Sequence, residues 1–269
     1  MRYASLFISL GACGFNAPPA AEAEVEPAAV NTPVVPQADD VRVAFFDAHY
    51  QDDTWFAVPV ACVTQEGTVL GNEACAAKLT GQVATLPAGR TVLGGMTTVT
   101  CEPTGDRAMA LVAPIDDEHS SQATWGYLGV GVPSGWHLAS RSRADDALMA
   151  PALATLVDSR WPLSPDATDV QLDERMDLNG TRVLEAFAPS MADDKPGYSA
   201  LFVAGSDILP LPTTGLSLNG RIRTPGAFPV PNNGYILVLT SKWMGGSGVH
   251  AVHLAEAGPV TIGEWACGT

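Results

Sequence analysis

Basic side chains are scarce in this chain of 269 residues. It contains 14 lysines and arginines against 29 aspartates and glutamates, which gives a net charge of −15 at pH 7 and a pI near 4.5. Binding to nucleic acid needs clustered cations that neutralise phosphates, so the sequence predicts no nucleic-acid partner. The same deficit argues against electrostatic docking on an anionic lipid surface.

Long apolar runs are also missing beyond the N-terminus. The runs at 55–63 and 235–239 have the length of strands, whereas a membrane-spanning helix needs about 20 apolar residues. No two cysteines stand at CxxC spacing, which disfavours a structural zinc site. We therefore expect neither a metal nor a cofactor.

The first thirteen residues, MRYASLFISLGAC, have the layout of an export signal. Arg2 supplies a positive n-region, residues 3–10 form a short apolar h-region, and Gly11 and Ala12 are small residues ahead of Cys13. This order predicts a cleavable signal peptide over residues 1–12.

The string LGAC at residues 10–13 resembles the lipobox of bacterial lipoproteins. The resemblance implies cleavage before Cys13, a diacylglyceryl thioether on its sulfur and an acyl chain on its amine. Two or more acyl chains hold a protein stably on a bilayer. Gly14 stands where resemblance to enteric lipoproteins would place an inner-membrane retention Asp, which implies the outer membrane, facing the periplasm or the surface. The alternative is an ordinary signal peptide cut nearby, with Cys13 left as a spare thiol.

The sequence predicts a disordered tether over residues 13–40. Ala, Pro, Glu and Val dominate this segment, and no periodic apolar face runs through it. Such a composition cannot bury enough apolar surface to offset the entropy of ordering. Its prolines favour semi-extended conformations that hold the following body away from the membrane.

From residue 41 onward the sequence predicts an all-β body. Short runs rich in Val, Leu, Phe, Tyr and Trp are bounded by Gly, Pro, Asp and Asn, which is typical of a hairpin-rich sandwich or barrel-like fold. We expect two β-rich halves, residues 41–142 and 162–269. The predicted hairpin turns are Asp52-Asp53, Asp116-Asp117, Asp193-Asp194 and Asn232-Asn233-Gly234.

A helical connector is predicted over residues 143–161, between the two halves. Ser142 is a candidate N-cap, and Asp145 and Asp146 in the first turn favour the helix dipole. Pro151 either kinks this helix or starts a second short one.

The other four cysteines predict disulfides. An even number of cysteines in an exported body suggests two bridges, for which three pairings are open. We favour Cys62 with Cys75, closing a short loop, and Cys101 with Cys267, tying the C-terminal strand to the first half.

The strongest candidate binding surface is aromatic. Trp125, Tyr127, Trp136 and His137 flank a glycine-rich stretch and could form an exposed platform for sugar or peptide. Alternating residues of a strand are equally good core, and both interpretations stay open.

Residues that could carry catalysis or bind metal form no convincing cluster. His250 and His253 lie in a strand-like run, where their odd offset points them to opposite faces. The segment with Asp173, Asp177 and Asn179 is a partial match to a calcium loop but has Thr181 where an acid is expected. We predict no catalytic residue.

These observations favour a non-catalytic lipoprotein of the cell envelope. It would be held on the membrane by the lipid on Cys13 and would bind an unknown protein or glycan partner. The alternatives are a carbohydrate- or peptide-binding surface module and, with no local motif in its favour, a secreted hydrolase.

Overall fold

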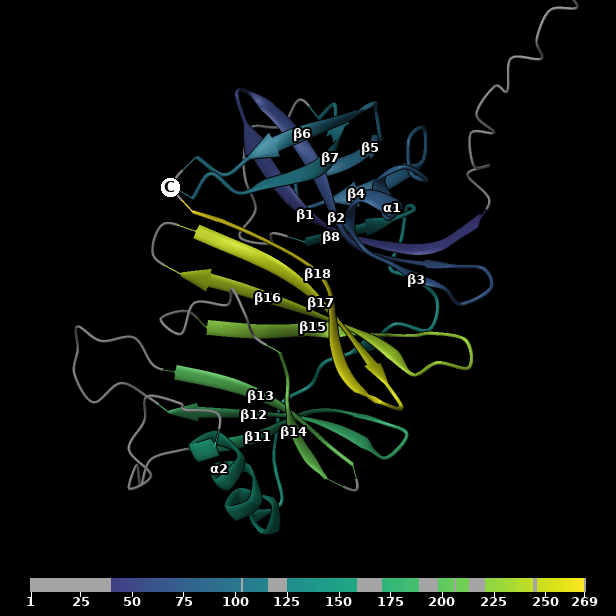
Figure 1. The fold of residues 1–269 in the computed structure, drawn as a ribbon. Coiled ribbons are helices and arrows are strands. Elements are labelled where there is room, and N and C mark those ends of the chain that lie inside the picture. The colour runs from purple at the N-terminus through teal and green to yellow at the C-terminus, as the bar shows by residue number, and fades with distance from the viewer. Residues whose placement is uncertain are drawn as a thin grey trace, which may run out of the picture. The chain divides into compact units, whose positions relative to one another are not determined.

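Every pairing between the described strands is antiparallel, so the predicted all-β fold is confirmed (Figure 1). The computed structural model describes residues 40–102, 104–115, 125–158, 171–188, 198–205, 207–212, 221–243 and 246–268. The predicted signal peptide, Cys13 and nearly all of the predicted tether lie outside the described residues. Residues 36–269 form a single compact unit, and the division of the body into halves 41–142 and 162–269 stays a prediction.

Sheet A comes from the first part of the body. Its strands are β1 (Val41–Gln51), β2 (Thr54–Thr64), β3 (Val69–Leu70), β4 (Val83–Leu86), β5 (Gly89–Val92), β6 (Met96–Thr100), β7 (Arg107–Ala113) and β8 (Trp125–Leu128). They lie in the order β5-β4-β8-β1-β2-β7-β6, with β3 paired to β2. The sheet curls so strongly that the residues after β5, at one edge, reach β7 near the other edge. There, Gly94 N donates to Val112 O at 2.7 Å.

Two further sheets follow. Sheet B has the order β18-β17-β16-β15-β9 and sheet C the order β10-β11-β12-β13-β14. The strands of sheet B are β9 (His137–Leu138), β15 (Arg221–Pro229), β16 (Tyr235–Trp243), β17 (Gly246–Ala255) and β18 (Gly258–Gly268). The strands of sheet C are β10 (Ser142–Arg143), β11 (Gln171–Leu178), β12 (Thr181–Ala188), β13 (Tyr198–Ala204) and β14 (Ile208–Pro210).

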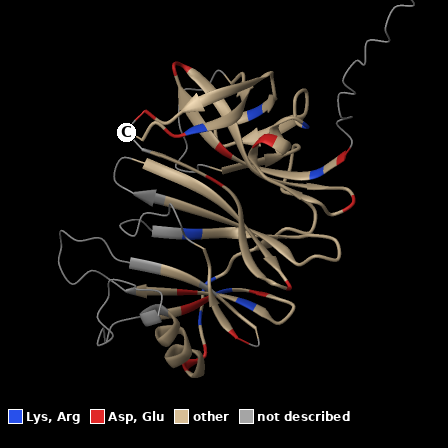
Figure 2. Ribbon diagram, in the orientation of Figure 1, with Lys and Arg blue, Asp and Glu red and all other residues tan. Residues whose placement is uncertain are grey.

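Sheet B is the middle layer of a three-layer sandwich. Along β16, Ile236 and Val238 pack with Phe45 of sheet A, whereas Leu237 and Leu239 pack with residues of sheet C. Because both of its faces are buried, β16 reads as a continuous apolar run instead of an alternating one. Figure 2 accordingly shows few charged positions along the strands of sheet B.

Short helices pack on the faces of sheets A and C that point away from sheet B. Helix α1 (Asn72–Ala76) joins the core enclosed by the curled sheet A, and α2 (Met149–Asp158) packs on sheet C. The prediction from the sequence did not include α1, because a helix of five residues is too short to show a helical period.

The connector helix begins later than predicted. Ser142 and Arg143 form strand β10, and a 3₁₀ turn (Asp146–Leu148) leads into α2. Asp145, not Ser142, is the N-cap, because its side chain accepts from Ala147 N at 2.9 Å. Pro151 lies in the first turn of α2, where its missing N–H removes no helical hydrogen bond.

Three of the four predicted hairpins are confirmed as strand pairings, while the predicted turns Asp116-Asp117 and Asp193-Asp194 lie outside the described residues. β1 pairs with β2, β12 with β13, and β15 with β16. The hairpin predicted around Asp116-Asp117 is wrong: β7 pairs with β2 and β8 with β1, so the two strands flank the β1–β2 hairpin. The connection between β7 and β8 is too long to force them into a tight turn.

The favoured cysteine pairing is confirmed. Cys62 on β2 lies 5.5 Å from Cys75 on α1, and Cys101 lies 5.4 Å from Cys267 on β18, both measured between Cα atoms. The second disulfide joins sheet A to sheet B.

Candidate functional site

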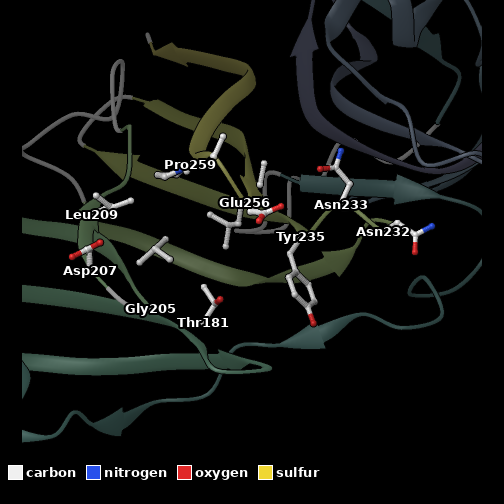
Figure 3. A pocket seen from close by; sticks show the side chains of 15 residues that line it. Thr181, Gly205, Asp207, Leu209, Asn232, Asn233, Tyr235, Glu256 and Pro259 are labelled. Atoms are coloured by element: carbon white, nitrogen blue, oxygen red, sulfur yellow. The ribbon is translucent and has the colours of Figure 1, made fainter.

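Hairpin turns from sheets B and C converge around a cavity of about 570 Å³ (Figure 3). It lies at the β11–β12, β13–β14, β15–β16 and β17–β18 ends of the two sheets. This volume falls in the range of small-molecule sites. Its lining residues are Thr181, Val203, Gly205, Asp207, Leu209, Asn232, Asn233, Gly234, Tyr235, Leu254, Ala255, Glu256, Ala257, Gly258 and Pro259.

The turn between β15 and β16 is fixed by its own backbone. Asn232 and Gly234 have positive φ, +56° and +75°, which Asn and Gly tolerate best. A Cβ on Gly234 would overlap the carbonyl oxygen of Leu254, so only glycine fits there. His253 Nε2 lies 2.6 Å from Asn233 O, and this contact fixes the position of that carbonyl in the turn. The wall of the pocket is therefore preorganised.

The polar lining carries negative charge only. Asp207 and Glu256 line the pocket from two different turns, and Asn232 and Asn233 line it from a third, with the amide of Asn232 pointing away from the two carboxylates (Figure 3). Of the described residues that line the pocket, none is Lys, Arg or His. This lining suits hydrogen-bond donors and disfavours anions.

Tyr235 gives the pocket an aromatic wall. Asn179 Nδ2 donates to its hydroxyl at 2.6 Å, which ties β16 to the β11–β12 turn. His137 packs against it with ring centroids 5.6 Å apart at an interplanar angle of 83°. These two contacts hold the ring in one orientation.

The four residues predicted as a binding surface are brought together only in part. Trp125 and Trp136 stack at 5.3 Å with an interplanar angle of 21°, and Tyr127 contacts Trp125. All three are partly buried against the core between sheets A and B, so they contribute to packing as well as to the surface. His137 is exposed and packs against Tyr235, which lines the pocket.

The histidines of β17 point to opposite faces, as predicted, and both are buried. His250 Nδ1 lies 3.3 Å from Glu264 Oε2. Burial lowers the pKa of His250 to about 4 and raises the pKa of Glu264. His250 pairs with Leu239 of β16, and Ser241 on the same strand pairs with Gly248, so Ser241 and His250 are not direct cross-strand partners. Both side chains are buried, 2% and 1% exposed, which closes them to a substrate.

The partial calcium motif is a hairpin. Asn179 and Gly180 form a tight turn with φ of +55° and +93°, and Asp177 Oδ1 accepts from Gly180 N at 2.7 Å. Asp173 pairs with Arg141 Nε at 2.7 Å. Within the described ranges, no three His, Cys, Asp or Glu side chains gather as metal ligands.

Sequence reasoning missed a buried carboxyl on β1. Asp47 is 3% exposed, and its Oδ2 has no hydrogen-bond partner in the described part of the chain. Burial raises its pKa well above the ordinary value. An apolar flank in the sequence (AFFDAHY) hints at this burial but does not distinguish it from a strand end.

The pocket was also missed, although its turns were visible. Asn179-Gly180 and Asn233-Gly234 are strong hairpin signals in the sequence. That these turns meet depends on how sheets B and C stack, which no local pattern encodes.

No helix among the described residues is long and apolar enough to cross a bilayer.

Comparison with known proteins adds no family. No protein-family model, no curated protein and no solved structure matches this chain.

Proposed function

We propose that this chain is a non-catalytic lipoprotein of the cell envelope whose β-rich body binds a partner through the pocket at the hairpin turns. The observation that carries the proposal is the pocket itself, since its volume suits a ligand and the β15–β16 turn on its wall is fixed by Asn232 and Gly234 at positive φ. Asp207 and Glu256 lie on different turns and apart from each other in Figure 3, which disfavours their acting as a catalytic pair. The chemistry of a hydrolase would need a base and a nucleophile within reach of each other.

The envelope location rests on two independent features. The LGAC string after an apolar segment resembles a lipobox, and the two disulfides favour an oxidising compartment. The proposed outer-membrane anchor is the lipid on Cys13, followed by a tether over residues 13–40. Such a tether would let the pocket reach a partner away from the bilayer.

Site-specific cross-linking in the producing cells tests the binding function. A photoreactive diazirine amino acid placed at Asn232, on the pocket wall, should give an adduct in the envelope fraction after illumination. The matched control places it at Asp53, in the β1–β2 turn away from the pocket lining, and should give none. Equal adducts from both positions, or none from Asn232, would contradict the proposal.

A further inference from the structure

We propose that Asn233, in the β15–β16 turn at the pocket, is a modification site that undergoes spontaneous deamidation. Asn179, in the β11–β12 turn, is protected from the same reaction. Both asparagines are exposed, and each is followed by glycine, Gly234 and Gly180. Because glycine has no side chain to shield its backbone nitrogen, deamidation is least hindered at an Asn-Gly pair. The two pairs are equivalent in sequence, and their hydrogen bonds distinguish them.

The reaction needs only the chain itself and water. The backbone nitrogen of Gly234 attacks Cγ of Asn233, and the side-chain nitrogen leaves as ammonia with the proton of the glycine N–H. The product is a cyclic succinimide, whose two carbonyl carbons are both open to water. Hydrolysis at the side-chain carbonyl leaves an aspartate, and hydrolysis at the backbone carbonyl leaves an isoaspartate with one more methylene in the main chain. No oxidant or reductant takes part.

Both reacting groups are free in the β15–β16 turn. Among the described residues, neither the side-chain amide of Asn233 nor the backbone N–H of Gly234 has a hydrogen-bond partner. The turn is held through other atoms: Val230 N donates to Gly234 O at 2.9 Å, and Asn233 N donates to Val230 O at 3.1 Å. The amide can therefore approach the glycine nitrogen without breaking a hydrogen bond of either reacting group.

His253 favours the reaction at Asn233. Its Nε2 lies 2.6 Å from Asn233 O. A carbonyl oxygen only accepts, so Nε2 is the donor. Donation to this oxygen withdraws electron density from the peptide group between Asn233 and Gly234, which makes the Gly234 N–H more acidic. The attacking species is the deprotonated nitrogen, so this contact promotes the attack.

Both reacting groups of the other pair are held. Asn179 Nδ2 donates to the hydroxyl of Tyr235 at 2.6 Å, and Gly180 N donates to Asp177 Oδ1 at 2.7 Å. The first bond restrains the amide, and the second retains the proton that the attacking nitrogen must lose. Breaking two hydrogen bonds before the attack should slow the reaction at Asn179 about tenfold or more.

Deamidation changes the wall of the pocket. Asn233 and Tyr235 both belong to its lining (Figure 3). Either product replaces a neutral amide by a carboxylate, and the isoaspartate also lengthens the main chain of the turn. The pocket would then occur in an unmodified and a modified form. The chemistry uses only the turn, so the site does not depend on the proposed binding function.

Peptide mapping of the folded full-length protein tests the inference. The detergent-solubilised protein is incubated in heavy-oxygen water at mildly alkaline pH, so that hydrolysis during the incubation labels the product. Trypsin then separates the two sites, because Asn179 falls in the peptide of residues 176–182 and Asn233 in that of residues 224–242. Asn219-Gly220, which lies outside the described residues, falls in a third peptide.

Asn233 should gain the label at least about tenfold faster than Asn179. At unfolding concentrations of urea both turns are lost, and the two sites should react at comparable rates. Asn233→Gln needs a larger ring to close and should remove nearly all product from residues 224–242. This variant separates Asn233 from its neighbour Asn232 in the same peptide.

A second pair of variants releases the protected site. Asp177→Ala, at an exposed position, removes the acceptor of Gly180 N and should accelerate deamidation of Asn179 several-fold. Adding Tyr235→Phe, which removes the acceptor of the Asn179 amide, should bring the acceleration to about tenfold or more.

The inference is overturned by equal rates at Asn179 and Asn233 in the folded protein. It is also overturned by no product at Asn233, or by no acceleration at Asn179 in Asp177→Ala. Cross-linking from Asn232 is a separate measurement. Its failure would remove the proposed binding function and leave the modification site standing, and failure of the mapping would leave the binding function standing.

Discussion

Burial changes the acid–base behaviour of several side chains in the sandwich, Asp47 and His250 among them. Asp47 faces the interior between sheets A and B, and burial raises its pKa. His250 faces the other side of sheet B, and burial lowers its pKa to about 4. In both cases burial disfavours the charged form, because the side chain loses its hydration.

The His250 shift predicts a loss of stability in acid. Above pH 6.5 the imidazole is neutral in both the folded and unfolded states. As the pH falls from 6.5 to 4, the unfolded chain binds a proton that the folded chain does not, so the free energy of unfolding decreases. The shift from 6.5 to about 4 corresponds to about 3 kcal/mol for this group.

Urea denaturation of wild type and His250→Leu across pH 4–7 measures this effect. The variant should lose the part of the pH dependence that comes from His250. Asp47 acts in the opposite direction, since its raised pKa makes the fold more stable as the pH falls, and it is present in both proteins. Parallel curves for the two proteins would show that His250 contributes nothing.

At the scale of elements, turn chemistry made two hairpins predictable, β1–β2 and β15–β16. A two-residue turn with positive φ, such as Asp52-Asp53 at +49° and +58°, fixes the register of both strands. The long connection between β7 and β8 does not fix a register between them. The two strands pair with β2 and β1 instead, so the predicted β7–β8 hairpin is wrong. Likewise, the pocket depends on how two sheets stack, which the sequence of each turn does not encode.

Close packing at Gly226 predicts a sensitive position on β15. A Cβ there would collide with Trp136 Cε2 and with His137 O. Gly226→Ala should displace Trp136 from its stack on Trp125, and overpacking of this kind destabilises by about 1–3 kcal/mol. The measurement is thermal unfolding together with tryptophan emission.

Gly131→Ala is the matched control for this substitution. Gly131 lies in the connection between β8 and β9, and a Cβ there would meet nothing within 4 Å. It should change neither the unfolding temperature nor the emission spectrum appreciably. Equal effects of the two substitutions would mean that the Trp136 contact does not limit position 226.

The disulfide between sheets A and B predicts a large stability difference. Cys101 and Cys267 are 166 residues apart in sequence, whereas Cys62 and Cys75 are 13 apart. In the chain-entropy treatment a bridge over the longer loop restricts the unfolded chain more, by about 2 kcal/mol. Replacing Cys101 and Cys267 by serine should therefore cost about 5 kcal/mol, and replacing Cys62 and Cys75 about 3 kcal/mol.

Peptide mapping without reductant checks the premise of that comparison. It should recover the Cys62–Cys75 and Cys101–Cys267 cross-linked peptides from the exported protein. Free thiols at these four positions, or a crossed pairing such as Cys62 with Cys101, would contradict it.

At the scale of the whole molecule, the chain is strongly acidic. Its charge disfavours electrostatic docking on anionic lipid, and the proposed attachment is the lipid on Cys13. A single acyl chain binds a bilayer only marginally, while the two or three chains that the lipobox resemblance implies bind stably. The whole tether and body would then depend on one residue for their location.

Cys13→Ser tests this dependence directly. The variant should no longer incorporate labelled fatty acid, should keep its unprocessed N-terminal segment, and should leave the outer-membrane fraction. The body's fold should be unaffected, because residues 36–269 form a compact unit of their own, and its disulfides should still form. The resemblance implies that an Asp after the lipidated cysteine retains a lipoprotein in the inner membrane. Gly14→Asp in the otherwise native chain should therefore redirect the lipidated protein to the inner membrane. Undiminished fatty-acid incorporation in Cys13→Ser would remove the lipid anchor from the proposal, while leaving the pocket and its ligand to be judged by their own experiments.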